Sequence, residues 1–148
     1  MTAKTPNLLF VCVENSCRSQ MAEGLLRFMG RDAVEAFSAG THPKPIHSLA
    51  IQSMADLGID ISGQWSKKID EYLDQDFDFV ITVCARAAQE CPTWPRAREQ
   101  IRWHFDDPAA ATGTDAQRKT VFRRVREEIR QRISLFLLAN RITETGRK

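Results

Sequence analysis

Cys12 and Arg18 stand in the spacing Cys-x5-Arg, directly after an apolar run near the start of the chain. A guanidinium offers a planar fork of donors that suits bidentate binding of an oxyanion. Its positive charge also favours the thiolate form of a nearby cysteine, and the thiolate is the nucleophile. Ser19 follows the arginine and can donate a hydroxyl hydrogen bond to that thiolate. This pattern predicts a cysteine that attacks phosphorus, arsenic or a similar centre in a bound oxyanion.

Four cysteines are present, namely Cys12, Cys17, Cys84 and Cys91, and their spacing bears on their roles. No pair has C-x-x-C spacing and no histidine stands at ligand spacing, so no zinc site is predicted. As the last residue of an apolar run, Cys84 alone would favour a core residue. Its pairing with Cys91, in a chain that also carries Cys12, favours redox chemistry instead. Cys17 is expected to be a small buried thiol that shapes its turn.

Short apolar runs alternate with amphipathic stretches, and these elements would position the cysteines. The runs predict strands over 7–11, 34–38, 77–83 and 101–105. Helices are expected after the first strand, with Gly30 near the end of that helix, and over about 46–57, 69–73 and 115–140. The pattern predicts an α/β fold in which residues 1–148 form a single domain. That domain has a mainly parallel central sheet flanked by helices.

The loop after the first strand is the expected binding site. In parallel α/β sheets, ligands bind beyond the carboxyl ends of strands, and helix N-termini attract anions. Backbone N–H groups of the loop, together with the side chain of Arg18, would therefore bind the substrate. The loop residues are Val13, Glu14, Asn15, Ser16 and Cys17. Asn15 is expected to hold the loop's shape through side-chain hydrogen bonds, and Cys84 should reach the same sheet edge as Cys12.

Composition excludes several other classes of protein. The chain has 148 residues, 43% of them hydrophobic and 27% charged, which is enough apolar material for a packed core. A net charge of +2 is too balanced to suggest a nucleic-acid partner. No apolar run approaches the roughly 20 residues that span a bilayer. Residues 1–7 lack the features of a secretory signal, so a cytoplasmic protein with no membrane association is expected.

The segment CVENSCRSQMAE, from Cys12 to Glu23, closely resembles the phosphate-binding loop of a known family. That family comprises arsenate reductases built on the low-molecular-weight tyrosine phosphatase fold. The resemblance continues, in the family's order, through FSAGT (37–41), LGIDISG (57–63), FVITVCARAAQECP (79–92) and FDDPA (105–109). It covers most of the chain.

The resemblance implies a thiol relay that reduces arsenate. Cys12 attacks arsenate while Asp107, the aspartate directly before a proline, protonates the departing oxygen. Cys84 then attacks Cys12 and releases arsenite, and Cys91 attacks Cys84. Thioredoxin is the reductant that this cysteine spacing implies, although a glutaredoxin or another small thiol stays open. A monomer that needs no cofactor and no metal is expected.

Helix geometry constrains the last step of such a relay. Along one continuous helix, the Cα atoms of residues 84 and 91 would lie about 10.5 Å apart. A disulfide tolerates at most about 7 Å. A bond between Cys84 and Cys91 therefore requires this segment to unwind or loop out.

Two departures from related patterns bear on function. Some family members bind potassium through four residues, of which Asn15, Glu23 and Ser38 match three. The fourth position carries Lys67, whose ammonium can replace the cation, so no potassium requirement is expected. The main alternative is a low-molecular-weight tyrosine phosphatase, but small residues after Pro108 stand where such phosphatases usually carry aromatic ones. A non-catalytic anion-sensing module is a third alternative, disfavoured by the joint presence of nucleophile, arginine and acid.

Overall fold

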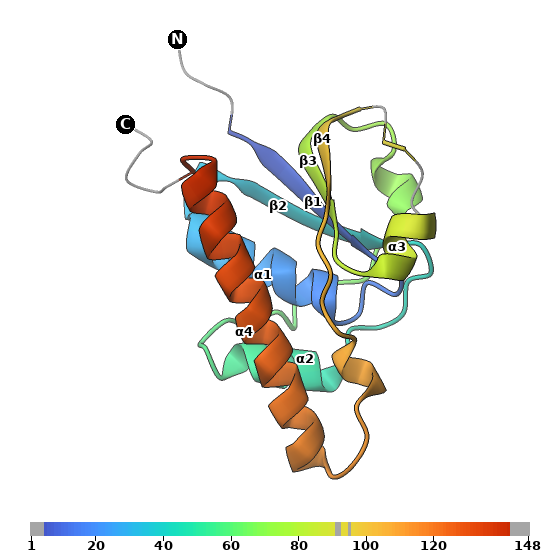
Figure 1. Cartoon of the computed structure of the whole chain (residues 1–148), viewed down its shortest axis with the longest axis vertical. Helices are drawn as coiled ribbons and strands as arrows, with labels where there is room; N and C mark the ends of the chain where they lie inside the picture. The colour runs from blue at the N-terminus through green and yellow to red at the C-terminus, as the bar shows by residue number, and fades with distance from the viewer. Residues whose placement is uncertain (1–4, 91–92, 95, 143–148) are drawn as a thin grey trace.

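Four parallel strands in the order β2-β1-β3-β4 form the centre of the protein (Figure 1). The computed structural model describes residues 5–90, 93–94 and 96–142. The strands are β1 (Asn7–Cys12), β2 (Glu35–Gly40), β3 (Phe77–Thr82) and β4 (Ala97–Arg102). All six residues of β1 are buried, as expected of an apolar run in the interior of a parallel sheet. The expected α/β fold with a parallel sheet is confirmed.

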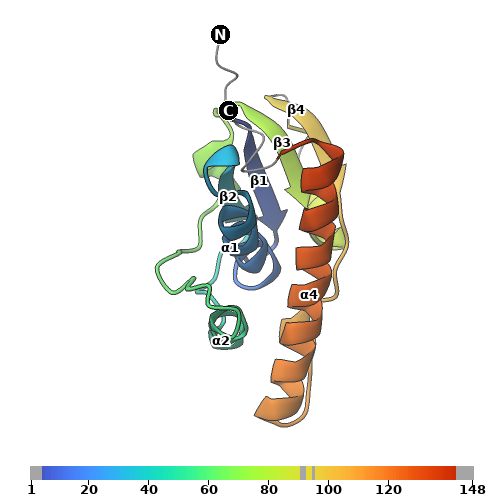
Figure 2. The same cartoon turned by 90° about the vertical axis from the view of Figure 1, so that its left-hand side faces the viewer.

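Helices pack around this sheet, and the longest of them braces two others. The helices are α1 (Arg18–Gly30), α2 (Ser48–Ala55), α3 (Ala85–Glu90) and α4 (Asp115–Ala139), with short 3-10 segments η1 (Arg31–Ala33), η2 (Ile69–Tyr72) and η3 (Pro108–Ala110). Helix α4 packs against both α1 and α2 (Figures 1 and 2). Its buried stripe has the three-to-four spacing of an amphipathic helix and includes Phe122, Val125, Ile129 and Ile133.

The fourth strand differs from the sequence expectation. A strand was expected over 101–105, but β4 spans Ala97–Arg102, so the two overlap by only two residues. The reason is that β4 is an edge strand whose sequence AREQIR is largely exposed and carries no apolar run. The aromatic residues that suggested a strand lie beyond its end. There Trp103 and Phe105 are buried, with the Trp103 ring 6.0 Å from that of Phe10.

Helix α3 is a second difference, because the predicted element order ran from the third strand directly to the fourth. The structure places this six-residue helix between them. A parallel pair cannot be joined by a tight hairpin, so a crossover connection between β3 and β4 is required. No helix in the described ranges is long and apolar enough to cross a membrane.

The sheet brings the ends of β1 and β3 together. In the register of these strands, Val11 pairs with Thr82. Val83 then donates its backbone N–H to the Val11 carbonyl at 3.0 Å. Cys12 and Cys84 therefore follow paired positions and lie at the same edge of the sheet, as the parallel topology predicted.

Candidate active site

The loop between β1 and α1 is built around Asn15, which is fully buried and has a φ of 51°. Asparagine tolerates this left-handed conformation better than most residues. Its Nδ2 donates to Ser19 Oγ at 2.8 Å and to Ser38 Oγ at 3.0 Å. Its Oδ1 accepts from Gln20 Nε2 at 2.9 Å and from the backbone N–H of Lys67 at 2.9 Å. The side-chain hydrogen bonds expected of Asn15 are therefore present, and they tie the loop to three other segments.

Gly40, at the end of β2, lies directly against this loop. A Cβ atom at that position would stand 2.6 Å from the Val13 carbonyl oxygen and 2.9 Å from the Asn15 nitrogen. Both contacts involve backbone atoms, which cannot move aside as a flexible side chain would. The absence of a side chain at Gly40 thus permits the close approach of β2 to the loop.

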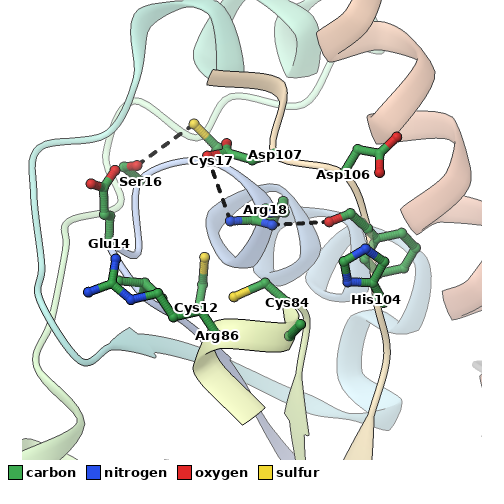
Figure 3. A pocket seen from close by; sticks show the side chains of 13 residues that line it. Cys12, Glu14, Ser16, Cys17, Arg18, Cys84, Arg86, His104, Asp106 and Asp107 are labelled. Atoms are coloured by element: carbon green, nitrogen blue, oxygen red, sulfur yellow. Dashed lines mark hydrogen bonds and ion pairs between the residues drawn. The ribbon is translucent and has the colours of Figure 1, made fainter. Parts of the chain in front are cut away.

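A cavity of about 380 Å³ opens above the loop (Figure 3). It is lined by residues that follow three strands of the sheet: the loop residues, the start of α3 with Cys84 and Arg86, and the segment 104–107. Arg18 crosses it, donating from Nη1 to the Phe105 carbonyl at 3.0 Å. Its buried Nε has no hydrogen-bond partner in the part of the chain that the structure describes. A buried donor without a partner is costly, so this atom favours an acceptor in the cavity.

The sulfur atoms of Cys12 and Cys84 face each other in this cavity (Figure 3). A hydrogen bond from Cys84 lowers the pKa of Cys12 most, ahead of the Arg18 charge and the backbone N–H groups of Glu14 and Val13. Burial opposes these effects, and the net pKa of Cys12 is about 6. Cys12 is therefore a thiolate at neutral pH.

Cys84 shows the opposite behaviour. The pKa of its thiol is raised well above the ordinary value, first by the hydrogen bond to Cys12 and then by burial. Its sulfur also accepts the backbone N–H of Ala87 at 3.3 Å, within α3. The two cysteines thus share one proton: Cys84 holds it while Cys12 carries the charge.

The other predicted site residues that the structure describes lie nearby. Cys17 lines the cavity, but burial raises the pKa of its thiol to about 12, so it stays protonated at neutral pH. The Ser19 hydroxyl accepts a hydrogen bond from Asn15, and donation to the Cys12 thiolate stays a prediction. Cys91 lies outside the described residues.

Asp106 and Asp107, the two aspartates before Pro108, point in different directions (Figure 3). Asp107 Oδ2 lies 3.9 Å from Arg18 Nη2, and its Oδ1 accepts from Ala109 N at 3.0 Å, which caps η3. Asp106 instead accepts from Arg124 of α4 at 3.3 Å. The structure therefore places the carboxyl of Asp107, rather than that of Asp106, next to the Arg18 guanidinium.

Gln20 supports the loop and was not among the predicted site residues. Its Nε2 donates to the Asn15 carbonyl and to the Trp65 carbonyl, both at 3.0 Å, in addition to the Asn15 side chain. One feature of the sequence could have indicated a structural role for Gln20. Gln20 and Glu23 are polar residues three positions apart in a helix, and both prove to be buried.

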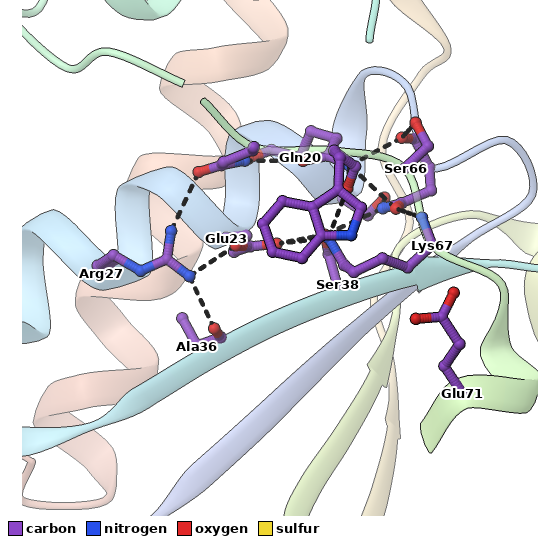
Figure 4. A network of polar contacts seen from close by, with 12 residues as sticks. Gln20, Glu23, Arg27, Ala36, Ser38, Ser66, Lys67 and Glu71 are labelled. Atoms are coloured by element: carbon purple, nitrogen blue, oxygen red, sulfur yellow. Dashed lines mark hydrogen bonds and ion pairs between the residues drawn. The ribbon is translucent and has the colours of Figure 1, made fainter. Parts of the chain in front are cut away.

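A buried charged network lies behind the loop (Figure 4). Glu23 accepts from Ser38 Oγ at 2.5 Å and from Arg27 Nη2 at 2.6 Å, and it lies 3.6 Å from Lys67 Nζ. Burial lowers the pKa of Lys67, and the Glu23 charge opposes that effect. The Lys67 ammonium also donates to the Trp65 carbonyl at 2.6 Å. The structure thus brings together the four positions that correspond to the potassium site of some family members, and the Lys67 side chain lies among the other three.

These features define a class of protein. An ionised cysteine in an anion-binding loop, at the carboxyl edge of a parallel sheet, is the site of an enzyme that attacks tetrahedral oxyanions. Residues 7–148 match the model of the low molecular weight phosphotyrosine protein phosphatase family. The chain belongs to this family.

Within this family, the chain is similar to proteins that are arsenate reductases. An arsenate reductase of Halalkalibacterium halodurans is 45% identical over 140 residues, covering 95% of this chain and 96% of the relative. A solved arsenate reductase in the phosphate binding state superposes with a TM-score of 0.78 at 36% identity, covering 93% of this chain and 99% of the other. A thioredoxin-dependent arsenate reductase of Corynebacterium glutamicum has a TM-score of 0.69 at 27% identity, covering 94% and 65%. The resemblance found in the sequence is confirmed.

Proposed function

We propose that this protein reduces arsenate to arsenite, with Cys12 as nucleophile and with Cys84 and Cys91 carrying the oxidation away. The observation that carries the proposal is the pair formed by an ionised Cys12 and a protonated Cys84 in one anion-binding cavity. A phosphatase of this fold needs only the first of these cysteines. The arsenate reductases among the relatives support the same reaction.

The first step forms a bond between Cys12 and arsenic. Arsenate binds to Arg18, whose buried Nε has no partner among the described residues, and to the backbone N–H groups of the loop. The Cys12 thiolate attacks arsenic, and a hydroxyl group of the protonated arsenate leaves as the As–O bond breaks. Asp107, 3.9 Å from the same guanidinium, gives that oxygen its proton, so water departs.

The second step reduces the arsenic. Cys84 loses its proton and attacks the Cys12 sulfur, forming a Cys12–Cys84 disulfide. The bond between Cys12 and arsenic breaks, and its electron pair stays on arsenic, which leaves as arsenite. Two thiols have then supplied the two electrons that convert As(V) to As(III).

The third step restores Cys12. Cys91 attacks Cys84, and Cys12 leaves as a thiolate, which the Arg18 charge and the backbone N–H groups of the loop stabilise. We further propose that thioredoxin reduces the resulting Cys84–Cys91 disulfide, as the thioredoxin-dependent relative suggests. The proposal includes a cytoplasmic monomer without a nucleic-acid or membrane partner, since free thiols persist in a reducing compartment.

Arsenate turnover with thioredoxin, thioredoxin reductase and NADPH tests this function. Wild type is compared with Cys84→Ser and Cys91→Ser, and Cys17→Ser serves as the matched control because it removes a cysteine from the same cavity. The two relay variants should lose multiple turnover, whereas Cys17→Ser should retain it. Full turnover in both relay variants would exclude the relay.

The phosphatase alternative is measured in the same preparation with a small aryl phosphate. Weak hydrolysis is expected because the anion-binding loop is shared between the two activities. Ala109 and Ala110 provide no aromatic wall for phosphotyrosine. Phosphatase turnover that exceeded arsenate reduction would favour the alternative.

A further inference from the structure

The six-residue helix α3 stands between the second and third cysteines of the proposed relay. It begins directly after Cys84, whose carbonyl accepts the first helical N–H, from Ala88, at 3.1 Å. Seven residues at the helical rise span about 10.5 Å, beyond the roughly 7 Å that a disulfide tolerates. The proposed third step thus includes the opening of α3, and whatever holds α3 closed affects that step.

Little inside α3 itself keeps it helical. Helices of this length are unstable in isolation because nucleation is costly. Ala87 is the one buried residue of α3, and the rest of the helix is partly or fully exposed. The helix thus depends on contacts with neighbouring segments.

Glu90, the last residue of α3, makes these contacts. Its Oε1 accepts from Thr41 Oγ1 at 2.9 Å and lies 3.5 Å from His42 Nε2. Its Oε2 accepts from Arg86 Nε, one turn earlier, at 2.6 Å. The hydrogen bond from Arg86, and next that from Thr41, lower the pKa of Glu90, so the group is a carboxylate at neutral pH.

The segment that contacts Glu90 (Thr41 and His42) is itself hydrogen-bonded to the anion-binding loop. Thr41 donates its backbone N–H to the Cys12 carbonyl at 3.3 Å, and His42 donates to the Val13 carbonyl at 2.7 Å. A single carboxylate therefore connects the far end of α3 to the backbone of the nucleophile.

We propose that Glu90 is a positioning residue that holds α3 closed through Thr41, and that breaking this contact limits the rate at which Cys91 attacks Cys84. The inference rests on the proposed relay. In the limited step, the Cys91 thiol gives its proton to solvent and attacks the Cys84 sulfur. The Cys12–Cys84 bond breaks, the Cys84–Cys91 bond forms, and Cys12 leaves as a thiolate. No net oxidation accompanies this exchange.

The variant Thr41→Val removes the hydroxyl that Glu90 accepts from and leaves the pair of Arg86 and Glu90 in place. Thr41→Ser keeps the hydroxyl and is the conservative rescue. Glu128→Ala controls for the general effect of removing an exposed side-chain contact, because it deletes the pair with Arg124 on α4, at 2.9 Å.

Reduced protein is mixed with arsenate in the absence of thioredoxin and quenched with an alkylating reagent, and the disulfides are assigned by mass spectrometry. Arsenite release should match wild type in every variant. Conversion of the Cys12–Cys84 disulfide to Cys84–Cys91 should be about three- to tenfold faster in Thr41→Val, the effect of losing one ordinary hydrogen bond. Thr41→Ser and Glu128→Ala should convert at the wild-type rate. An unchanged or slower conversion in Thr41→Val would overturn the proposal.

Amide hydrogen exchange in the reduced protein provides a second measurement that does not depend on arsenate. The Ala88 amide, which donates within α3, should exchange faster in Thr41→Val than in Thr41→Ser. Equal exchange in the two variants would show that Glu90 does not hold the helix. Failure of the proposed function is recognised separately, because wild type would then release no arsenite and form no Cys12–Cys84 disulfide.

Discussion

Replacing Cys84 with alanine should raise the pKa of Cys12. The hydrogen bond from Cys84 is the largest cause of the low value, ahead of the Arg18 charge and the loop N–H groups. Alanine removes this donor while leaving the other stabilising groups in place. The pKa of Cys12 should therefore move from about 6 toward its ordinary value of 9.0 without reaching it.

The size of the effect follows from these two limits. At pH 7.5, a group with a pKa of 6 is about 97% ionised, whereas one with a pKa of 9 is about 3% ionised. At this pH the complete shift changes the thiolate fraction roughly thirtyfold, and the three pKa units themselves correspond to about 4 kcal/mol in the relative free energy of the two protonation states. Cys84→Ala should lose part of this, because Arg18 still acts on the thiolate.

The assay is the rate of alkylation of Cys12 by iodoacetamide between pH 5 and 10, with the modified peptide identified by mass spectrometry. Wild type should show a midpoint near 6, so its reactivity falls as the pH drops through that value. In Cys84→Ala the midpoint should lie higher. Cys84→Ser should stay closer to wild type, because a hydroxyl can still donate to the thiolate. Cys17→Ser should leave the midpoint unchanged.

One result would refute the reasoning. If Cys84→Ala titrated with the wild-type midpoint, the hydrogen bond between the two sulfurs would not be what ionises Cys12. The low pKa would then have to come from Arg18 and the backbone alone.

Four further predictions concern the acid, the loop and the buried network. Asp107→Asn should slow single-turnover arsenite release by about 10²–10⁴-fold, whereas Asp106→Asn should leave it near wild type. Gly40→Ala should weaken competitive inhibition by phosphate by about tenfold or more, because its Cβ would meet loop backbone at 2.6 Å; Gly63→Ala, with open space around it, is the control. Arsenate turnover should be the same in potassium and sodium chloride, and a potassium-specific rise would show that Lys67 does not replace the cation. Lys67→Met should lower the free energy of unfolding in urea by about 3 kcal/mol, since it removes one partner of a buried pair.

The parts of the fold that the sequence predicts are those whose burial follows a simple period. The run from Asn7 to Cys12 is apolar and becomes a buried strand, and α4 shows its stripe over many turns. The strand β4 has no such signal, because an edge strand need not be apolar to be paired. Helix α3 has only six residues, half of them alanine, so its sequence carries no periodic pattern. The parallel topology requires a crossover there without specifying its form.

The candidate site was predicted as a set of residues but not as a set of contacts. The motif places Cys12 and Arg18 in one loop, and the parallel topology places Cys84 at the same edge. Whether two strand-end sulfurs meet depends on the register of β1 and β3, which pairs Val11 with Thr82. Periodicity cannot specify this register, since β1 is buried throughout and β3 at every residue except Asp78. The hydrogen bond that Thr41 donates to Glu90 likewise joins segments that only the folded sheet brings together.

The shared proton of Cys12 and Cys84 also explains how the proposed relay keeps its order. While Cys12 is a thiolate, its charge and its hydrogen bond keep the pKa of Cys84 high, so the reduced protein presents a single nucleophile to arsenate. Once Cys12 has bonded to arsenic, its sulfur no longer carries that charge and accepts a proton poorly. The largest cause of the raised pKa of Cys84 is then gone, and Cys84 can ionise where it is needed, beside the sulfur that it attacks. Consumption of the first thiolate thus activates the second, and no separate base is required to time the transfer.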